Sequence, residues 1–302
     1  MKTITIGTRG SSLALAQTEL VRSALRAVSP GVEIRVRTIH TTGDILSEAP
    51  LDAIGGKGVF VKDIEQHLLD GRIDIAVHSL KDMQALLPEG LTISAYLKRE
   101  DPRDMLFSEE GYTLETLPKG ARVGTSSMRR RCQIRSLRPD LAITHIRGNV
   151  PTRLKKVGQG FDAVILAAAG VIRLNLPLGI ASPLGVALDT QTMIPSPGQG
   201  IIAVESRRDD ARLAEALRHL DHADTRLCAE AERSFLGTLG QDCRLPAGAY
   251  ASLCDEGISI LGCLGTSDEK NLCTLSMTGK TSEVGRLLAE RLRKMISGGG
   301  ES

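Results

Sequence analysis

Two segments of this 302-residue chain follow one pattern, and this repetition limits the possible folds more than any other feature. Ile6-Gly7-Thr8-Arg9-Gly10-Ser11-Ser12 and Val123-Gly124-Thr125-Ser126-Ser127 both place Gly-Thr at the end of an apolar strand and hydroxyl residues at the start of a helix. Asp74-Ile75-Ala76-Val77 and Asp162-Ala163-Val164-Ile165 also match each other. Strands that alternate with helices form parallel sheets through crossover connections. The sequence therefore predicts two α/β domains of one design, with a ligand cleft between them.

The part of the chain beyond about residue 223 has a different pattern. Three short strands are expected at residues 249–253, 258–264 and 272–277, and the segments between them are short enough for antiparallel hairpins. Helices are expected before and after these strands, and residues 297–302 are expected to be disordered. The region is therefore predicted to be a third, α+β domain.

Two helices are expected to bury apolar stripes, one near the N-terminus and one near the C-terminus. The stripes are formed by Leu20, Val21, Ala24, Leu25 and Val28 and by Val284, Leu287, Leu288, Leu292 and Met295.

Composition argues against several classes of protein. Lysine and arginine total 38 against 36 acidic residues, and a net charge of +2 is too small to bind nucleic acid by charge alone. Aromatic residues make up only 2%, which argues against stacking of bases or sugars. No apolar run reaches the roughly 18 to 20 residues of a membrane span, and no signal peptide is visible.

The cysteines and histidines show no metal-site spacing. No Cys-x-x-Cys pair occurs, which argues against a zinc ribbon, and no ligand cluster stands out among the six histidines. A cytoplasmic protein with reduced thiols and no metal is therefore expected. Five cysteines are expected to fill the core: Cys132, Cys228, Cys254, Cys263 and Cys273.

Arginines recur at turns and helix starts, beside glycine and serine. A lone arginine is most often solvated surface charge. The repeated placement instead favours a polyanionic small ligand, because helix N-termini and guanidinium groups both bind carboxylate or phosphate. The arginines in question are Arg9, Arg129, Arg130, Arg131, Arg147, Arg153 and Arg173.

His78-Ser79-Leu80-Lys81-Asp82 directly follows a buried strand, where α/β folds place ligand-binding groups. Asp82 is suited to accept hydrogen bonds from a ligand N–H or to stabilise a developing cation, and Lys81 to neutralise a carboxylate. A Lys-Asp pair after a strand is otherwise usually a solvated turn. Gly55-Gly56-Lys57-Gly58 lacks the spacing of a P-loop. Cys243 lies in a polar loop beside Arg244, which favours a nucleophile or a covalent attachment point.

Taken together, these segments resemble the porphobilinogen deaminase (hydroxymethylbilane synthase) family along nearly the whole chain. The resemblance is carried by motifs in family order: Gly7-Thr8-Arg9-Gly10-Ser11, Gly55-Gly56-Lys57-Gly58, Val77-His78-Ser79-Leu80-Lys81-Asp82, Arg99-Glu100-Asp101-Pro102-Arg103-Asp104, Val123-Gly124-Thr125-Ser126-Ser127-Met128-Arg129-Arg130, Arg147-Gly148-Asn149-Val150 with Thr152-Arg153-Leu154, Pro197-Gly198-Gln199-Gly200, and the Cys243 loop.

The resemblance implies a transferase that joins four porphobilinogen molecules head to tail, releasing ammonia each time, to give the linear tetrapyrrole hydroxymethylbilane. Growth starts on a dipyrromethane cofactor held by a thioether to one cysteine, which the motif places at Cys243. The catalytic aspartate falls on Asp82. A carboxylate that faces the pyrrole N–H groups stabilises the positive charge of the intermediates, and it is suited to shuttle protons.

The resemblance also gives the arginines a ligand, because each pyrrole carries an acetate and a propionate. The implied cofactor-binding residues are Cys243, Lys81, Thr125, Ser126, Ser127, Arg129, Arg130 and Arg147. The implied substrate-binding residues are Arg9, Ser11, Lys57, Arg153, Arg173, Gln199 and Gly200.

The implied fold has two periplasmic-binding-protein-like α/β domains around a cleft, and a small α+β C-terminal domain with a three-stranded antiparallel sheet. Domain 1 is expected at residues 1–98 and 200–218, domain 2 at 103–194 and domain 3 at 223–302. A monomer is expected, with porphobilinogen as the small-molecule substrate and neither nucleic acid nor membrane as a partner.

Three positions depart from the family pattern. Gln241-Asp242 stands where the family usually has Gly-Gly before the cofactor cysteine, Ala53 replaces a common lysine, and Gln84 replaces a common proline. Two alternatives to the transferase therefore stay open. One is an inactive homologue that does not load its cofactor, and the other is a two-lobed protein that only binds a carboxylated ligand. A binding protein needs neither Cys243 nor Asp82, whereas the enzyme needs both.

Overall fold

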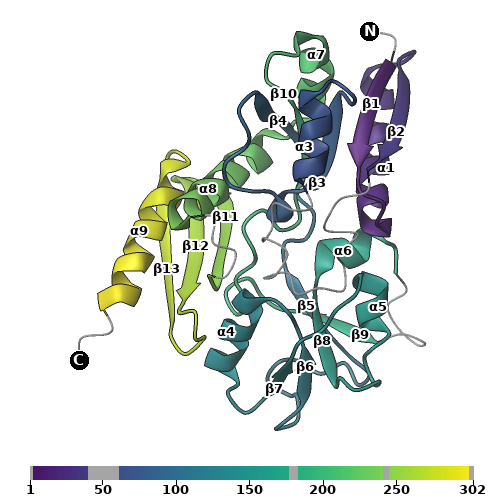
Figure 1. Cartoon of the computed structure of the whole chain (residues 1–302). Helices are drawn as coiled ribbons and strands as arrows, with labels where there is room; N and C mark the ends of the chain where they lie inside the picture. The colour runs from purple at the N-terminus through teal and green to yellow at the C-terminus, as the bar shows by residue number, and fades with distance from the viewer. Residues whose placement is uncertain (1–2, 40–60, 177–182, 241–244, 299–302) are drawn as a thin grey trace. The chain divides into compact units, whose positions relative to one another are not determined.

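The computed structural model describes residues 3–39, 61–176, 183–240 and 245–298 (Figure 1). The chain forms two compact units. The first comprises Met1–Arg99 and Ile201–Ala229, and the second comprises Glu100–Gly200 and Glu230–Ser302. The first unit contains one sheet, and the second contains two.

The first unit contains a five-stranded mixed sheet in the order β2-β1-β3-β10-β4. Its strands are β1 (Thr3–Thr8), β2 (Glu33–Thr38), β3 (Ile75–Ser79), β4 (Leu91–Tyr96) and β10 (Ile202–Arg207). β1 is parallel to β2 and β3, whereas β10 is antiparallel to both of its neighbours. One sheet face packs against α1 (Ser12–Val28) and α7 (Ala211–Leu220), and the other against α3 (Lys62–Leu69).

The second unit repeats this sheet with other residues, in the order β7-β6-β8-β5-β9. Its strands are β5 (Asp104–Ser108), β6 (Arg122–Gly124), β7 (Ala142–Thr144), β8 (Ala163–Ala167) and β9 (Leu184–Ala187). β6 is parallel to β7 and β8, and β5 is antiparallel to both of its neighbours. Helix α4 (Met128–Leu137) packs on one face, and α5 (Val150–Leu154) and α6 (Ala168–Arg173) pack on the other.

The predicted internal repeat is confirmed at the level of single hydrogen bonds. Ile6 pairs with Ile75 in the first sheet, as Val123 pairs with Ala163 in the second. The carboxylate of Asp74 accepts a hydrogen bond from the backbone N–H of Thr5 at 2.8 Å. The carboxylate of Asp162 accepts the equivalent bond from Arg122 N–H at 2.6 Å. The two sheets therefore share both strand order and local register.

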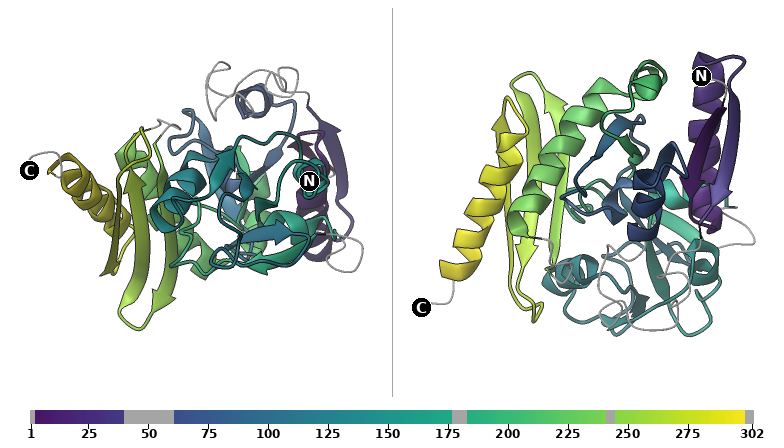
Figure 2. Two further views of the ribbon diagram at one scale, coloured as in Figure 1. Left: turned by 90° about the horizontal axis from the view of Figure 1, so that it is seen from below. Right: turned by 45° about the horizontal axis from the view of Figure 1, so that its top comes forward.

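The C-terminal region contains a separate antiparallel sheet of β11 (Ala247–Cys254), β12 (Gly257–Gly265) and β13 (Leu272–Gly279). Helix α9 (Glu283–Gly298) lies along this sheet, as does the later part of α8 (Ala223–Leu239) (Figure 2). The helices cross closely, because a Cβ added at Gly285 would lie 1.9 Å from the carbonyl oxygen of Ala231. The prediction of two α/β domains of one design and a three-stranded antiparallel sheet is confirmed.

Several local predictions need correction. The buried strand expected to end before His78 runs from Ile75 to Ser79, and the three C-terminal strands are longer than expected. Cys254 was expected in the core but is exposed, because it ends β11 at the hairpin, whereas Cys263 is buried. Four positions of the expected apolar stripes are also exposed, because each helix buries only a narrow face: Leu20, Val28, Leu287 and Met295.

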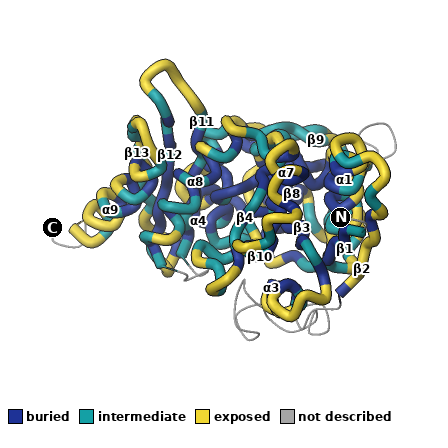
Figure 3. The backbone as a smooth tube through the Cα atoms, turned by 90° about the horizontal axis from the view of Figure 1, so that it is seen from above, coloured by how far each residue is buried: buried dark blue, intermediate teal, exposed yellow. Residues whose placement is uncertain are grey.

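Burial follows the sheets: β10 is almost entirely buried, while exposed residues follow the outer sides of α3 and α9 (Figure 3). Within the described ranges, no helix is both long and apolar enough to cross a membrane.

Candidate functional site

A small pocket of about 80 Å³ opens where β1 and β3 of the first unit end. Arg9 follows β1, Ser11 caps α1, and Asp82 ends a short 3-10 helix, η3 (Leu80–Asp82), that directly follows β3. All three residues line the pocket, together with Gln17 and His78. Ser11 holds its place because its hydroxyl accepts a hydrogen bond from the N–H of Ala14 at 3.3 Å. The parallel strand ends thus bring Arg9, Ser11 and Asp82 to one pocket.

Asp82 presents an exposed carboxylate to this pocket. No described residue forms an ion pair or hydrogen bond with its side chain. Lys81 lies beside it in η3 and is half-buried. The carboxylate is therefore available to a cationic or N–H-bearing ligand.

Three buried ionisable side chains lie beside the pocket, and one of them, His78, also lines it. The Nε2 atom of His78 lies 3.1 Å from Oε2 of Glu205, and both side chains are buried. Glu65 of α3 is also buried. Burial and the negative charge of Glu205 raise the pKa of Glu65 to about 7, against the opposing effects of His78 and Lys62.

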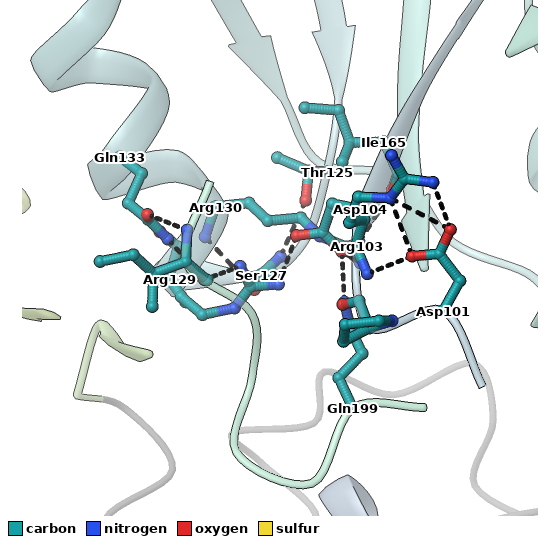
Figure 4. Close-up of polar contacts among 12 residues, drawn as sticks. Asp101, Arg103, Asp104, Thr125, Ser127, Arg129, Arg130, Gln133, Ile165 and Gln199 are labelled. Carbon is teal, nitrogen blue, oxygen red and sulfur yellow. Dashed lines mark hydrogen bonds and ion pairs between the residues drawn. The ribbon is translucent and has the colours of Figure 1, made fainter. Parts of the chain in front are cut away.

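The second unit contains a fully buried ionic cluster centred on Asp104 (Figure 4). Arg129 donates to Oδ2 of Asp104 at 2.8 Å, and Arg130 donates to Oδ1 at 2.7 Å. Gln199 donates to the same Oδ1 at 2.9 Å and to the carbonyl of Pro102 at 2.8 Å. These contacts tie the start of α4 and the segment before Gly200 to β5.

The electrostatics of this cluster fix Asp104 in its ionised form. Burial alone raises the pKa of Asp104, but the charges of Arg129 and Arg130, with the hydrogen bonds from Arg130 and Gln199, lower it further, so that it lies well below its ordinary value. The remaining guanidinium nitrogens reach backbone carbonyls, since Arg129 donates to Ile194 at 2.6 Å and Arg130 to Ile165 at 2.8 Å. One donor remains: the buried Nε of Arg130 has no hydrogen-bond partner among the described residues.

The hydroxyl residues between β6 and α4 are held by the local backbone. Ser127 caps α4 and accepts from the N–H of Arg130 at 3.4 Å. Ser126 donates to the carbonyl of Ile146 and accepts from its N–H at 3.2 Å. Thr125 is buried, and its hydroxyl accepts from the N–H of Ser127 at 3.2 Å. The hydroxyl groups of this loop are therefore held by backbone hydrogen bonds.

The other predicted arginines of the second unit lie at helix ends. Arg173 ends α6 and donates to the carbonyl of Gly200 at 2.6 Å, and burial lowers its pKa to about 10, against the opposing charge of Glu100. Arg153 lies in the last turn of α5 and donates to the carbonyl of Gly148 at 2.7 Å. Arg147 is half-buried just before α5, and its carbonyl accepts from Lys156 at 3.1 Å.

Some predicted positions lie outside the described residues: Lys57, Cys243, Ala53, Gln241 and Asp242. Gln84, which stands in place of the family's proline, is described and half-buried.

Sequence reasoning missed three participants in these clusters. Glu65, Glu205 and Asp104 were assigned no role, and His78 was noted only as part of a motif. Glu205 carries a usable signal, because it ends the apolar run Ile201-Ile202-Ala203-Val204 and a charge on a buried strand needs a partner. Within the described ranges, no group of His, Cys, Asp and Glu is arranged to hold a metal ion.

Comparison with known proteins gives concordant results. The family model described as "Porphobilinogen deaminase, dipyromethane cofactor binding domain" matches residues 4–215, and "Porphobilinogen deaminase, C-terminal domain" matches residues 226–294. A porphobilinogen deaminase of Roseiflexus sp. (strain RS-1) is 46% identical over 285 residues, 94% of this chain and 93% of the relative. That of Roseiflexus castenholzii is 44% identical over 300 residues, 99% of this chain and 97% of the relative.

Among solved structures, the BenM effector binding domain with its effector benzoate is similar, with a TM-score of 0.42 and 16% identity. The match covers 72% of this chain and 90% of that one.

Proposed function

The chain belongs to the porphobilinogen deaminase family, and we propose that the pocket of its first unit performs the family's condensation, with Asp82 as the catalytic carboxylate. This family is a transferase family that joins four porphobilinogen molecules head to tail into hydroxymethylbilane, with loss of one ammonia per unit, and it carries a dipyrromethane cofactor domain. The observation that carries the proposal is the exposed Asp82 carboxylate, which lines a pocket with Arg9 and Ser11.

Asp82 has a direct chemical role in this scheme. Loss of ammonia and attack by a second pyrrole both place positive charge on rings whose N–H groups are hydrogen-bond donors. A carboxylate held at the end of a strand accepts those N–H bonds and stabilises the charge as it develops. Arg9 and Ser11 on the same pocket wall are suited to bind a pyrrole carboxylate, because a guanidinium and a hydroxyl both donate to it.

The residues of the second unit fit a carboxylated cofactor. The buried Nε of Arg130 is a donor without a protein acceptor, and such a group is costly unless a ligand accepts from it. Arg129 and Arg130 otherwise hold Asp104, so we propose that they present one face to the cofactor and use the other to stay in place. Thr125, Ser126, Ser127, Lys81 and Arg147 are proposed to assist. When bound through Cys243, dipyrromethane supplies the ring to which substrate is added.

The remaining anchors follow the same chemistry. We propose that Lys57, Arg153, Arg173, Gln199 and Gly200 bind the carboxylates of substrate and of the growing chain. Arg173 and Gln199 are each fixed by a hydrogen bond within the second unit, which orients them in advance. Three functional domains are proposed at residues 1–98 with 200–218, 103–194 and 223–302. A cytoplasmic monomer is also proposed, in keeping with the free thiols of Cys132, Cys228, Cys254, Cys263 and Cys273.

The first test is the intact mass of the purified protein. We expect the wild type to exceed its polypeptide mass by two deaminated porphobilinogen units, and Cys243→Ser to lack this excess. Cys254→Ser is the matched control, because Cys254 is exposed and lies outside the proposed site. A wild-type protein that stays bare after incubation with porphobilinogen or with hydroxymethylbilane would instead identify an inactive homologue.

A further inference from the structure

Three ionisable side chains are buried together on the α3 side of the first sheet, and the chemistry proposed for Asp82 uses none of them. They are Glu65 of α3, His78 of β3 and Glu205 of β10, with exposures of 4%, 7% and 0%. In the antiparallel pair β3–β10, Ala203 faces His78 and Glu205 faces Ala76. Since side chains alternate along a strand, His78 and Glu205 project from the same sheet face. That face is the one covered by α3.

The contacts of Glu205 make it dependent on His78. Oε2 of Glu205 receives the hydrogen bond from Nε2 of His78, and Oε1 is buried with no partner among the described residues. A buried carboxylate needs a compensating donor, and here the imidazole provides it. Because Nε2 is committed to Glu205, Nδ1 is the ring nitrogen left for a ligand. His78 also forms part of the pocket wall that includes Asp82.

This arrangement resembles a general base in which a carboxylate orients an imidazole. A carboxylate bound to one ring nitrogen fixes the tautomer and stabilises the imidazolium when the other nitrogen takes a proton. Glu65 adds a second, titrating carboxylate, whose pKa of about 7 means that it gains its negative charge as the pH rises through neutrality. That negative charge and a positive charge on His78 attract each other. Lys62 on α3 partly offsets this attraction, and Arg9 and Asp82 face the same pocket.

The Asp104 cluster of the second unit provides a comparison within the same protein. Both oxygens of Asp104 are bonded, its charged partners are two arginines, and Asp104 itself is held ionised. In the cluster of Glu65, His78 and Glu205, one carboxylate oxygen has no partner among the described residues, Glu65 titrates near neutral pH, and His78 lines a pocket.

We propose that His78 is a second proton acceptor of the condensation, with Glu205 as the residue that positions it and Glu65 as a second carboxylate that stabilises positive charge on its ring. The inference rests on the proposed function of the pocket. In each addition, the C–N bond of the protonated aminomethyl group breaks, and both electrons leave with ammonia. The attacking ring carbon uses a ring electron pair to form the new C–C bond. Its C–H electrons then return to the ring, and the proton passes to Nδ1 of His78.

The cycle closes without a further reactant. The imidazolium formed on His78 is paired with the Glu205 carboxylate, so that the proton is held without an uncompensated buried charge. It is then released to water or to the departing ammonia, which becomes ammonium. Asp82 keeps the role proposed for it, which is to stabilise the cationic intermediates.

The test uses the cofactor-loaded enzyme and porphobilinogen carrying deuterium at its free ring carbon. For His78→Gln we expect a rate loss of about 100-fold and the appearance of a primary isotope effect, because removal of the ring proton becomes rate-limiting. For Glu65→Gln we expect little change at pH 6 but a loss of about tenfold at pH 8, because the variant lacks the second negative charge that stabilises a positive charge on the imidazole. Glu269→Gln is the matched control, because Glu269 is a buried carboxylate that pairs with Arg131 and Arg135 elsewhere in the chain.

The outcomes distinguish the role inferred for His78 from the function proposed for the pocket. Turnover by the wild type, with slow His78→Gln or Glu65→Gln variants that show no isotope effect and an unchanged pH profile, would overturn the inference and leave the proposed function standing. A loaded wild type without turnover would overturn both. Because removal of His78 strands the Glu205 charge, Glu65→Gln provides the second, milder variant, and melting temperature together with cofactor mass verifies that each variant folds.

Discussion

The two five-stranded sheets share strand order and strand directions, and in each an aspartate carboxylate accepts a hydrogen bond from a backbone N–H of the neighbouring strand. They differ in where their charged side chains lie. In the first sheet, the strand β3 leads into η3 and leaves Asp82 exposed at a pocket. In the second, the equivalent strand β8 leads into α6, whose Ala168-Ala169-Gly170 start is buried. The charges of the second sheet are instead buried and mutually bonded around Asp104. The same sheet topology thus carries an exposed carboxylate at a pocket in the first unit and a buried group of ion pairs around Asp104 in the second.

The sharpest test of this contrast is the replacement of Asp82. Asp82→Asn keeps the shape of the side chain and removes its charge, so the rate of hydroxymethylbilane formation should fall by about 100-fold to 10,000-fold. The free energy of unfolding should change by less than about 0.5 kcal/mol, because the side chain is exposed. Steady-state kinetics and urea unfolding of the same preparation provide both values. Near-normal turnover would remove Asp82 from the mechanism.

The replacement of Asp104 should show the reverse pattern. Asp104→Asn leaves Arg129 and Arg130 without their buried counter-charge, and it should lower the free energy of unfolding by about 3–5 kcal/mol. The pH dependence should change as well. Since the folded protein lowers the pKa of Asp104, its stabilising contribution is present above the unfolded value of about 3.9 and is lost as the pH falls below it.

Acid unfolding therefore distinguishes wild type from Asp104→Asn. Below about pH 4, the stability of the variant should fall less steeply than that of the wild type, because the variant has no carboxylate to protonate at this site. Parallel acid-unfolding curves would show that Asp104 is not held ionised by the two arginines.

The smallest expected effect tests the similarity of the two sheets. Asp74→Ala removes the carboxylate that accepts a hydrogen bond from the backbone N–H of Thr5, and Asp162→Ala removes the one that accepts from Arg122. Each replacement should lower the free energy of unfolding by about 1 kcal/mol. Asp74 also lies 3.3 Å from Arg212, so its replacement is expected to cost slightly more. Chemical denaturation of both variants makes the comparison. A cost found in only one sheet would show that the shared hydrogen bond does not have a shared role.

The predictions made from the sequence succeeded where the signal is contiguous. The Gly-Thr-hydroxyl segments and the Asp-led strands predicted the repeat, because each is a short run whose backbone geometry depends on its own residues. The reason that glycine stands at both Gly7 and Gly124 is tertiary, since a Cβ there would lie 2.3 Å from Ile73 and 2.8 Å from Phe161, respectively. Helix faces were less reliable: Leu20 and Leu287 fit a stripe but stay exposed, because the width of a buried face depends on the neighbouring element.

The repeated α/β design, the C-terminal antiparallel sheet, and the position of Asp82 and Arg9 at strand ends can all be inferred from the order of the residues. Which charged side chains face a pocket and which face each other depends on the three-dimensional arrangement. His78 and Glu205 are 127 positions apart, and Arg129 finds Asp104 across 25 positions. The physical reason is that the cost of a buried charge depends on its partners in space, and strand order rather than sequence distance sets those partners.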